Sequence, residues 1–237
     1  MAHCLLGALL VRAACRFHRA LGADAARALP QPVLDFHATG GLCSGGLLVE
    51  RGNWVGRIIA TLGMLPKQTP DALWDAPEPV VVRSRVDGDV VHWDRRFPEG
   101  VGIKSRWYFD EDSQLAVDSF TYLGIPDFAA FGFDLVPVDA GNRVVVPAPP
   151  PPPADDGEEK AAHSSVAAVR GFRHVTKKVW ILGVPLPAAL SLCADGVSIA
   201  HEDGLGWLVQ VAVVHPLFGL VVSYDGHVRL IADDNGE

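Results

Sequence analysis

Long hydrophobic runs are missing from this sequence of 237 residues. The apolar run nearest the N-terminus, residues 4–11, holds only eight residues, whereas a membrane-spanning helix needs about 18. We therefore expect no transmembrane segment. Three arginines and no acidic residue lie between this run and Asp24. Residues 1–15 are thus expected to form a helical extension, either an ordinary helix or an amphipathic targeting segment.

A basic excess is also missing. The formal net charge is −8, of which residues 155–160 contribute −3 and the tail, residues 231–237, contributes another −3. The rest of the chain is therefore close to neutral. Proteins that bind nucleic acids present clustered lysine and arginine side chains, so we expect no nucleic-acid partner.

Cysteine is scarce, and its four positions are Cys4, Cys15, Cys43 and Cys193. No two of them form a CxxC pair, and none stands beside a histidine at the spacing of zinc ligands. Such isolated thiols are typical of small buried side chains in a reducing compartment. We therefore expect no metal site and a cytoplasmic or other reducing location, with organelle targeting left open.

The common catalytic and cofactor motifs are absent as well. The chain has no GxGxxG opening a helix, no GxxxxGK[ST] loop, no GxSxG elbow, no HExxH pair and no EF-hand loop. The glycine-rich segment 40–46 precedes an expected strand, so no helix N-terminus is available there to bind phosphate. We expect this segment to be a flexible turn, and we expect no cofactor.

Two helices are predicted from the residues that are present. Residues 3–28 are rich in Ala, Leu and Arg, which favour helix, and Pro30 and Pro32 are expected to end it. Residues 54–64 place four apolar side chains on one helical face. These are Val55, Ile58, Ile59 and Leu62.

Short strands separated by turn residues account for most of the remaining chain. They are expected at 79–86, 89–97, 102–109, 114–121, 130–138, 142–146, 172–182, 197–202, 207–214 and 220–230. This pattern predicts an α+β fold, with a long curved antiparallel sheet or an incomplete barrel. The N-terminal helix accompanies this sheet, and the helix at about 54–64 would pack on its concave side.

The clearest hairpin surrounds Asp87-Gly88, a dipeptide favoured in two-residue turns. On one face of its strands lie Val82, Val86, Val91, Trp93 and Phe97, and on the other lie Arg83, Arg85, His92, Asp94 and Arg96. A turn at Asp87-Gly88 would place Arg83 opposite His92. This alternation is typical of a half-buried antiparallel sheet.

The polar face of this hairpin is one candidate binding site. Arg83, His92 and Asp94 together could hold an anionic group or tune the imidazole for proton transfer. The alternative is a solvated face with weak cross-strand charge pairs. Trp93 and Trp107 are further candidates, because aromatic side chains on a curved sheet either line an apolar pocket or fill a core.

The chain is predicted to hold one domain, residues 16–230. Residues 147–166 contain five consecutive prolines followed by acidic and small polar residues. Such a tract cannot pair in a sheet, so we expect a disordered insertion there and an acidic tail at 231–237.

Three separated stretches resemble the domain of unknown function 4166 (DUF4166) family. They are GLLVERGNWVGRIIATLGMLP at 46–66, VWILGVPLPAAL at 179–190 and HPLFGLVVSYDGHV at 215–228. Their order and spacing are similar to those of the family over about residues 16–230. The resemblance implies a domain that occurs alone or attached to Rossmann-type oxidoreductases, and it implies no catalytic residues.

Three functions follow as hypotheses. The first is a non-enzymatic module that binds an apolar, lipid-like small molecule, which requires an internal pocket. The second is a protein-interaction or scaffold domain with an oxidoreductase partner, which requires an exposed apolar patch. The third is an enzyme whose site surrounds Arg83, His92 and Asp94.

Overall fold

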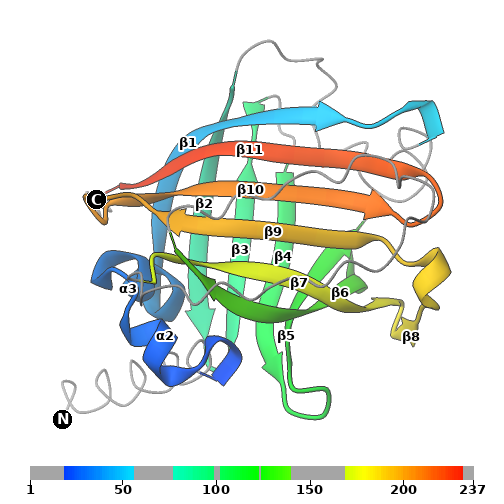
Figure 1. Cartoon of the computed structure of the whole chain (residues 1–237), viewed down its shortest axis with the longest axis horizontal. Helices are drawn as coiled ribbons and strands as arrows, with labels where there is room; N and C mark the ends of the chain where they lie inside the picture. The colour runs from blue at the N-terminus through cyan, green and yellow to red at the C-terminus, as the bar shows by residue number, and fades with distance from the viewer. Residues whose placement is uncertain (1–18, 56–76, 99–101, 123, 140–168, 232–237) are drawn as a thin grey trace, which may run out of the picture.

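The computed structural model describes residues 19–55, 77–98, 102–122, 124–139 and 169–231. Ten antiparallel strands within these ranges close into a barrel (Figure 1). They are β1 (Gly40–Arg51), β2 (Glu78–Asp87), β3 (Val90–Arg96), β4 (Gly102–Asp110), β5 (Leu115–Tyr122), β6 (Ile125–Val138), β7 (Gly171–Ile181), β9 (Cys193–Ala200), β10 (Gly206–His215) and β11 (Gly219–Ile231). A short strand, β8 (Val184–Pro185), pairs only with β7 among the described residues.

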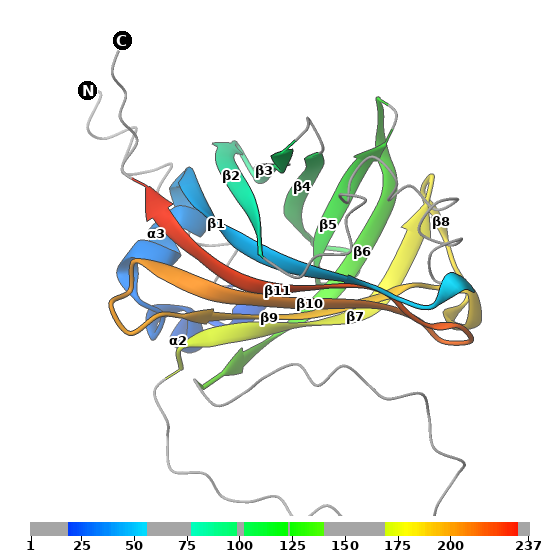
Figure 2. The same ribbon diagram turned by 90° about the horizontal axis from the view of Figure 1, so that it is seen from above.

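Two pairings close the ring. β1 pairs with β11, from Leu42 opposite Ile231 to Arg51 opposite Val222. β6 pairs with β7, the next described strand in the sequence. Strands β1, β11, β10 and β9 run across the direction of β2 to β5 (Figure 1), and the two walls face each other when the barrel is seen from above (Figure 2). The prediction of an antiparallel, strand-rich fold is confirmed, but the sheet is a closed barrel and the fold is mostly β. Closure removes the exposed strand edges that an open sheet would leave.

The alternation of side chains along each strand separates the barrel interior from its surface. On β10, Trp207, Val209, Val211 and Val213 point inward and line an internal space. Successive side chains of a strand point to opposite faces, so Leu208 and Gln210 lie on the other side. Most of the inward side chains are apolar, and the two charged ones are described below.

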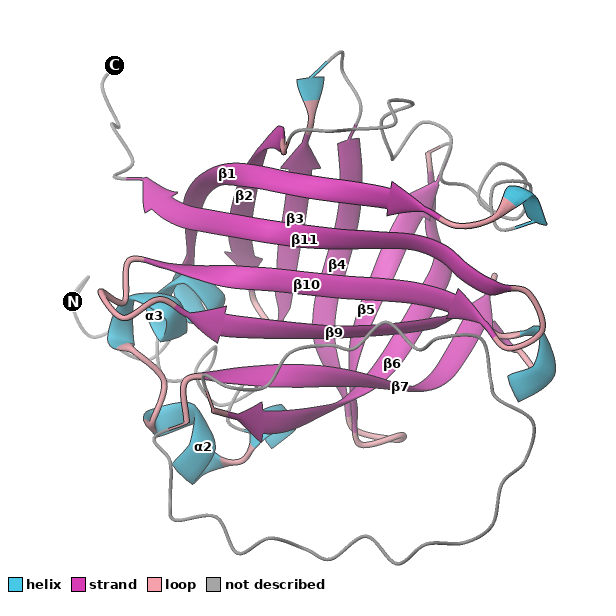
Figure 3. Ribbon diagram, turned by 45° about the horizontal axis from the view of Figure 1, so that its top comes forward, coloured by secondary structure: helices cyan, strands magenta, loops and turns pink. Residues whose placement is uncertain are grey.

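A helix covers one end of the barrel. Helix α2 (Ala23–Arg27) leads into α3 (Gln31–Thr39), which lies at the end of the barrel where β1 begins (Figure 3). Phe36 is 2% exposed and packs against Trp93 and Trp207, with ring centroids 5.5 and 4.9 Å apart. We call this end of the barrel the α3 end.

The predicted helices are only partly correct. The helix end expected before Pro30 is correct, because α2 ends at Arg27, but the sequence did not predict the helix that follows. Pro30 and Pro32 stand at the N-terminus of that helix, α3, where proline is tolerated because the first N–H groups have no helical partner. Most of the predicted helix 54–64 lies outside the described residues. The predicted role of that helix was to cover the concave side of the sheet. Within the described residues, α3 covers the barrel instead.

The glycine-rich segment is part of a strand rather than a turn. Residues 40–46 belong to β1, which pairs with β2 on one side and β11 on the other. A Cβ atom on Gly45 would lie 1.9 Å from the backbone oxygen of His227. Glycine is therefore required here by the close approach of two strands.

The β2–β3 hairpin keeps the predicted faces but not the predicted register. Val86 lies opposite Val91 and Asp87 lies opposite Val90, so the two turn residues are Gly88-Asp89. Arg83 consequently lies opposite Asp94 rather than His92. The shift changes each partner by two positions, which leaves every side chain on its predicted face because the side-chain period is two.

No helix within the described ranges is long and apolar enough to cross a bilayer. The predicted extension at 1–15 and the predicted insertion at 147–166 lie outside the described residues, as does the tail after Ile231.

Candidate functional site

The barrel encloses a cavity of about 610 Å³. All ten barrel strands contribute side chains to its wall, and most of these are apolar. Examples are Trp93, Trp107, Phe120, Phe131, Val209 and Val228. Ligand pockets in proteins typically measure about 300–1,000 Å³ and are mostly apolar, so the barrel interior is the candidate functional site.

The α3 end of the cavity is closed by aromatic rings. His37, on α3, contacts Trp93 and Trp207 with ring centroids 5.5 and 5.8 Å apart. It also contacts Phe172 on β7, with ring centroids 5.5 Å apart. The ring of His37 therefore forms part of the floor of the cavity.

The opposite end of the cavity reaches the protein surface. Leu190, in the short 3-10 helix η2 (Ala188–Leu190), and Phe218, in the β10–β11 turn, both line the cavity, and they are 60% and 42% exposed. Further large apolar side chains are exposed at this end, in β8 and in the connections between strands. They are Trp54, Leu182, Val184 and Leu217. We call the Leu190 and Phe218 side of the barrel the mouth.

One charged pair lies inside the cavity, on the two strands that flank β4. Arg95 on β3 and Asp118 on β5 lie with Arg95 Nη2 3.6 Å from Asp118 Oδ2. Ser105, on the intervening strand β4, accepts a hydrogen bond of 3.0 Å from Arg95 Nη1. The guanidinium also stands over the ring of Trp93, 5.1 Å from its centroid, at a distance typical of a cation–π contact.

Burial changes the acid–base behaviour of the groups around the cavity. It raises the pKa of Asp118, an effect that the charge of Arg95 and hydrogen bonding from Ser105 and Arg95 oppose. Burial and the neighbouring His174 lower the pKa of His37 to about 3. Burial and the charge of Arg95 lower the pKa of His174 to about 4. Both imidazoles are therefore neutral at pH 7, and they add no charge to the interior.

The five site residues predicted from the sequence divide between two faces. Trp93 and Trp107 line the cavity. Arg83, His92 and Asp94 occupy the alternate positions of the same hairpin and do not line it. Asp94 accepts hydrogen bonds of 3.0 and 2.7 Å from Arg96 Nε and Nη2, so its carboxylate already has a partner on that outer face.

Sequence reasoning missed Arg95 and Asp118. Arg95 interrupts the inward series Val91, Trp93 and Phe97 on β3, and Asp118 lies between the apolar Ala116 and Phe120 on β5. A single charge in an otherwise apolar period-two series was the available signal, since a buried charge is costly unless it is paired. To predict that Arg95 and Asp118 pair across β4, one would also need the register of β3, β4 and β5.

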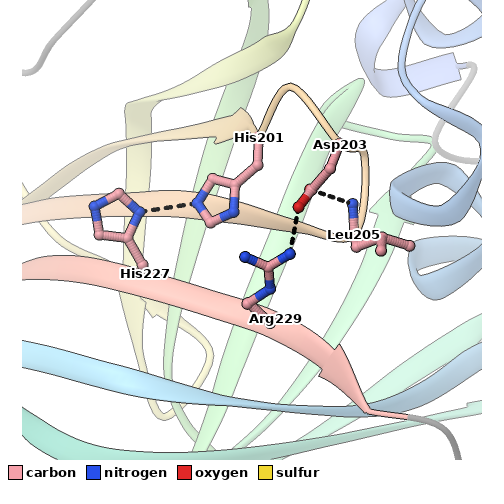
Figure 4. A network of polar contacts seen from close by, with 5 residues as sticks. All are labelled: His201, Asp203, Leu205, His227 and Arg229. Atoms are coloured by element: carbon pink, nitrogen blue, oxygen red, sulfur yellow. Dashed lines mark hydrogen bonds and ion pairs between the residues drawn. The ribbon is translucent and has the colours of Figure 1, made fainter.

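A second polar network lies at the surface of the α3 end. His201 Nε2 and His227 Nδ1 are 2.8 Å apart, and Arg229 pairs with Asp203, which also accepts a 2.9 Å hydrogen bond from the Leu205 amide (Figure 4). These contacts attach the β9–β10 turn to β11. No cluster of three or more His, Cys, Asp and Glu side chains that could hold a metal ion occurs in the part of the chain that the structure describes.

Comparison with known proteins places the chain in a family without adding a function. No curated protein matches it, and no solved structure matches it. The family model described as "Domain of unknown function (DUF4166)" matches residues 29–228, which run from just before α3 into β11. The resemblance drawn from three stretches of sequence is thereby confirmed, and the chain belongs to the DUF4166 family.

Proposed function

We propose that the barrel is a non-enzymatic binding module that holds an apolar, lipid-like molecule in its interior. The observation that supports this most strongly is the continuous, mostly apolar cavity of about 610 Å³. Side chains in a solid core pack at the density of organic crystals and leave few voids larger than a water molecule. An apolar space of this size in a closed barrel therefore suits a ligand better than it suits a structural core.

The two ends of the barrel support the same proposal. At the α3 end, Phe36 and His37 pack against tryptophan rings and cover the barrel. Leu190 and Phe218 line the cavity and are also exposed. The mouth is accordingly the proposed route of entry.

The first test is titration of the full chain with N-phenyl-1-naphthylamine, a neutral probe that fluoresces in apolar surroundings. Val209→Trp adds bulk inside the cavity, and Val136→Trp makes the same substitution on β6 at a side chain that is 44% exposed. We expect saturable binding to the wild-type protein and to Val136→Trp, and at least about 10-fold weaker binding to Val209→Trp, a difference of about 1.4 kcal/mol. A wild-type protein that leaves the probe dark would overturn the proposal.

The exposed apolar side chains near the mouth favour a second candidate, an interaction domain for an oxidoreductase partner, as the family resemblance implies. Leu217 and Trp54 are 67% and 73% exposed, and exposed apolar patches mark interaction surfaces. This candidate does not require the cavity to be filled. A full chain that binds no apolar probe but loses partner binding on Leu217→Asp substitution would support it over the first.

A further inference from the structure

The charges inside the cavity are balanced before any ligand enters. Among the described residues that line the cavity, Arg95 is the only Lys or Arg and Asp118 is the only Asp or Glu. His37 and His174 are neutral at pH 7 for the reasons given above, and His215, the third imidazole of the lining, accepts a hydrogen bond of 3.1 Å at Nδ1 from the Leu217 amide. A buried charge without a partner is costly, so an ionised ligand would disturb this balance and an uncharged one would not.

The pair nevertheless has hydrogen-bonding capacity left over. Asp118 Oδ1 is buried and has no hydrogen-bond partner among the residues that the structure describes. A guanidinium carries five N–H donors, and Arg95 donates one hydrogen bond to Ser105 while its Nη2 stands 3.6 Å from the carboxylate. Both side chains line the cavity, so the vacant acceptor and the spare donors lie beside the same interior space.

A hydroxyl group satisfies both demands at once, because it donates one hydrogen bond and accepts others. It could donate to Asp118 Oδ1 and accept from Arg95. A carboxylate only accepts, and it would bring a second negative charge beside Asp118. An ether or an alkyl end would leave Asp118 Oδ1 without a donor.

We propose that the ligand is an uncharged amphipathic molecule, an apolar body that ends in a hydroxyl group, and that Arg95 and Asp118 bind this hydroxyl. This proposal rests on the proposed function and specifies the ligand class for the same cavity. If each non-hydrogen atom takes roughly the ~30 Å³ of a liquid water molecule, the cavity of about 610 Å³ holds a ligand of about 20 such atoms. A long-chain alcohol has these properties.

The test displaces N-phenyl-1-naphthylamine from the full chain at pH 7.5 with three probes of equal chain length. These are 1-dodecanol, sodium dodecanoate and dodecyl methyl ether. We expect 1-dodecanol to displace the probe at a concentration at least about 10-fold lower than either of the others, because only the alcohol can donate a hydrogen bond to the carboxylate of Asp118.

Substitution of the anion gives a sharper result. Asp118→Asn removes the negative charge and leaves Arg95 unbalanced, so dodecanoate should gain at least about 10-fold in affinity relative to 1-dodecanol. Asp94→Asn makes the same chemical change on the outer face of the same wall and should leave the preference unaltered. Near-ultraviolet circular dichroism of each variant reports whether the barrel is intact.

A double variant covers the case in which Asp118→Asn does not fold. Arg95→Met with Asp118→Asn removes both charges, and we expect it to bind the fluorescent probe as the wild type does while losing its preference for the alcohol. Equal displacement by all three probes from the wild type would overturn the head-group inference and leave the proposed function standing. The same holds if both variants retain the preference of the wild type. If the fluorescent probe itself does not bind, the proposed function fails instead.

Discussion

His37 on α3 and His174 on β7 pack against the same ring, that of Phe172, with centroid distances of 5.5 and 5.1 Å. The covering helix and the barrel wall thus share one aromatic contact at the floor of the cavity. Protonation of either imidazole would place a charge in an apolar environment. The stability of the barrel is therefore linked to pH through these two residues.

The first prediction concerns this linkage. The pKa values of His37 and His174 are lowered in the fold from 6.5 to about 3 and about 4, so the unfolded chain binds more protons than the native chain below pH 6.5. The stabilisation is fully present above pH 6.5 and is lost as the pH falls. Urea unfolding between pH 6.5 and 5 should show the free energy of unfolding falling by up to about 1.4 kcal/mol per pH unit for each histidine.

Substitutions test whether His37 and His174 cause this pH dependence of the free energy of unfolding. His37→Leu should remove about half of it, and His37→Leu combined with His174→Leu should remove most of it. A His37→Leu protein with the full slope of the wild type would contradict the assignment.

The second prediction concerns the attachment of α3. Phe36 is 2% exposed and contacts both Trp93 and Trp207. Phe36→Ala should lower the free energy of unfolding by about 3–5 kcal/mol, because it removes a buried aromatic ring and leaves a void. Chemical denaturation followed by tryptophan fluorescence measures the change. A loss below about 1 kcal/mol would show that α3 is not an integral part of the barrel.

The third prediction concerns barrel closure. Gly45→Ala should cost about 2–3 kcal/mol, since the new Cβ would lie 1.9 Å from the His227 backbone oxygen on β11 and the strands would have to move apart. Gly88→Ala is the matched comparison. Its Cβ would meet nothing within 4 Å, and its cost of about 1 kcal/mol comes from the positive φ of 53° alone. Equal costs for the two variants would contradict the observed β1–β11 pairing.

The fourth prediction concerns Cys43 on β1, which is 0% exposed. Burial raises the pKa of its thiol to about 12, an effect that the charge of Arg95 opposes. Because the thiolate is the reactive form, native protein at pH 8 should leave Cys43 unmodified by iodoacetamide, while urea-unfolded protein should react fully. Peptide mapping by mass spectrometry compares the two. Rapid modification of the native protein would indicate that this wall of the barrel opens.

Local patterns were enough to predict part of this fold. The alternation around the β2–β3 turn placed Val82, Val91 and Trp93 on the inner face correctly, because a strand's period of two does not depend on its partners. The register required knowing which residues form the turn, and Asp87-Gly88 and Gly88-Asp89 both suit a two-residue turn. The family could be recognised because three stretches that resemble it lie in the expected order along the chain.

Closure and the cavity could not be predicted in the same way. Leu42 pairs with Ile231, near the opposite end of the chain. The alternation of side chains along one strand does not reveal such a distant partner. The segment 40–46 looked like a turn because glycine weakens a strand, yet its glycines admit a close strand neighbour. Arg95 and Asp118 looked like separate charges until the order of β3, β4 and β5 brought them together.

The central claim is that the barrel interior holds an apolar molecule, and native mass spectrometry of the full chain as purified tests it most directly. Spectra recorded before and after organic extraction reveal any small molecule bound to the protein. We predict one bound molecule per chain, uncharged and largely apolar, which is absent from Val209→Trp and retained by Val136→Trp. A wild-type protein that is empty, and stays empty after incubation with 1-dodecanol and dodecanoate, would contradict the claim.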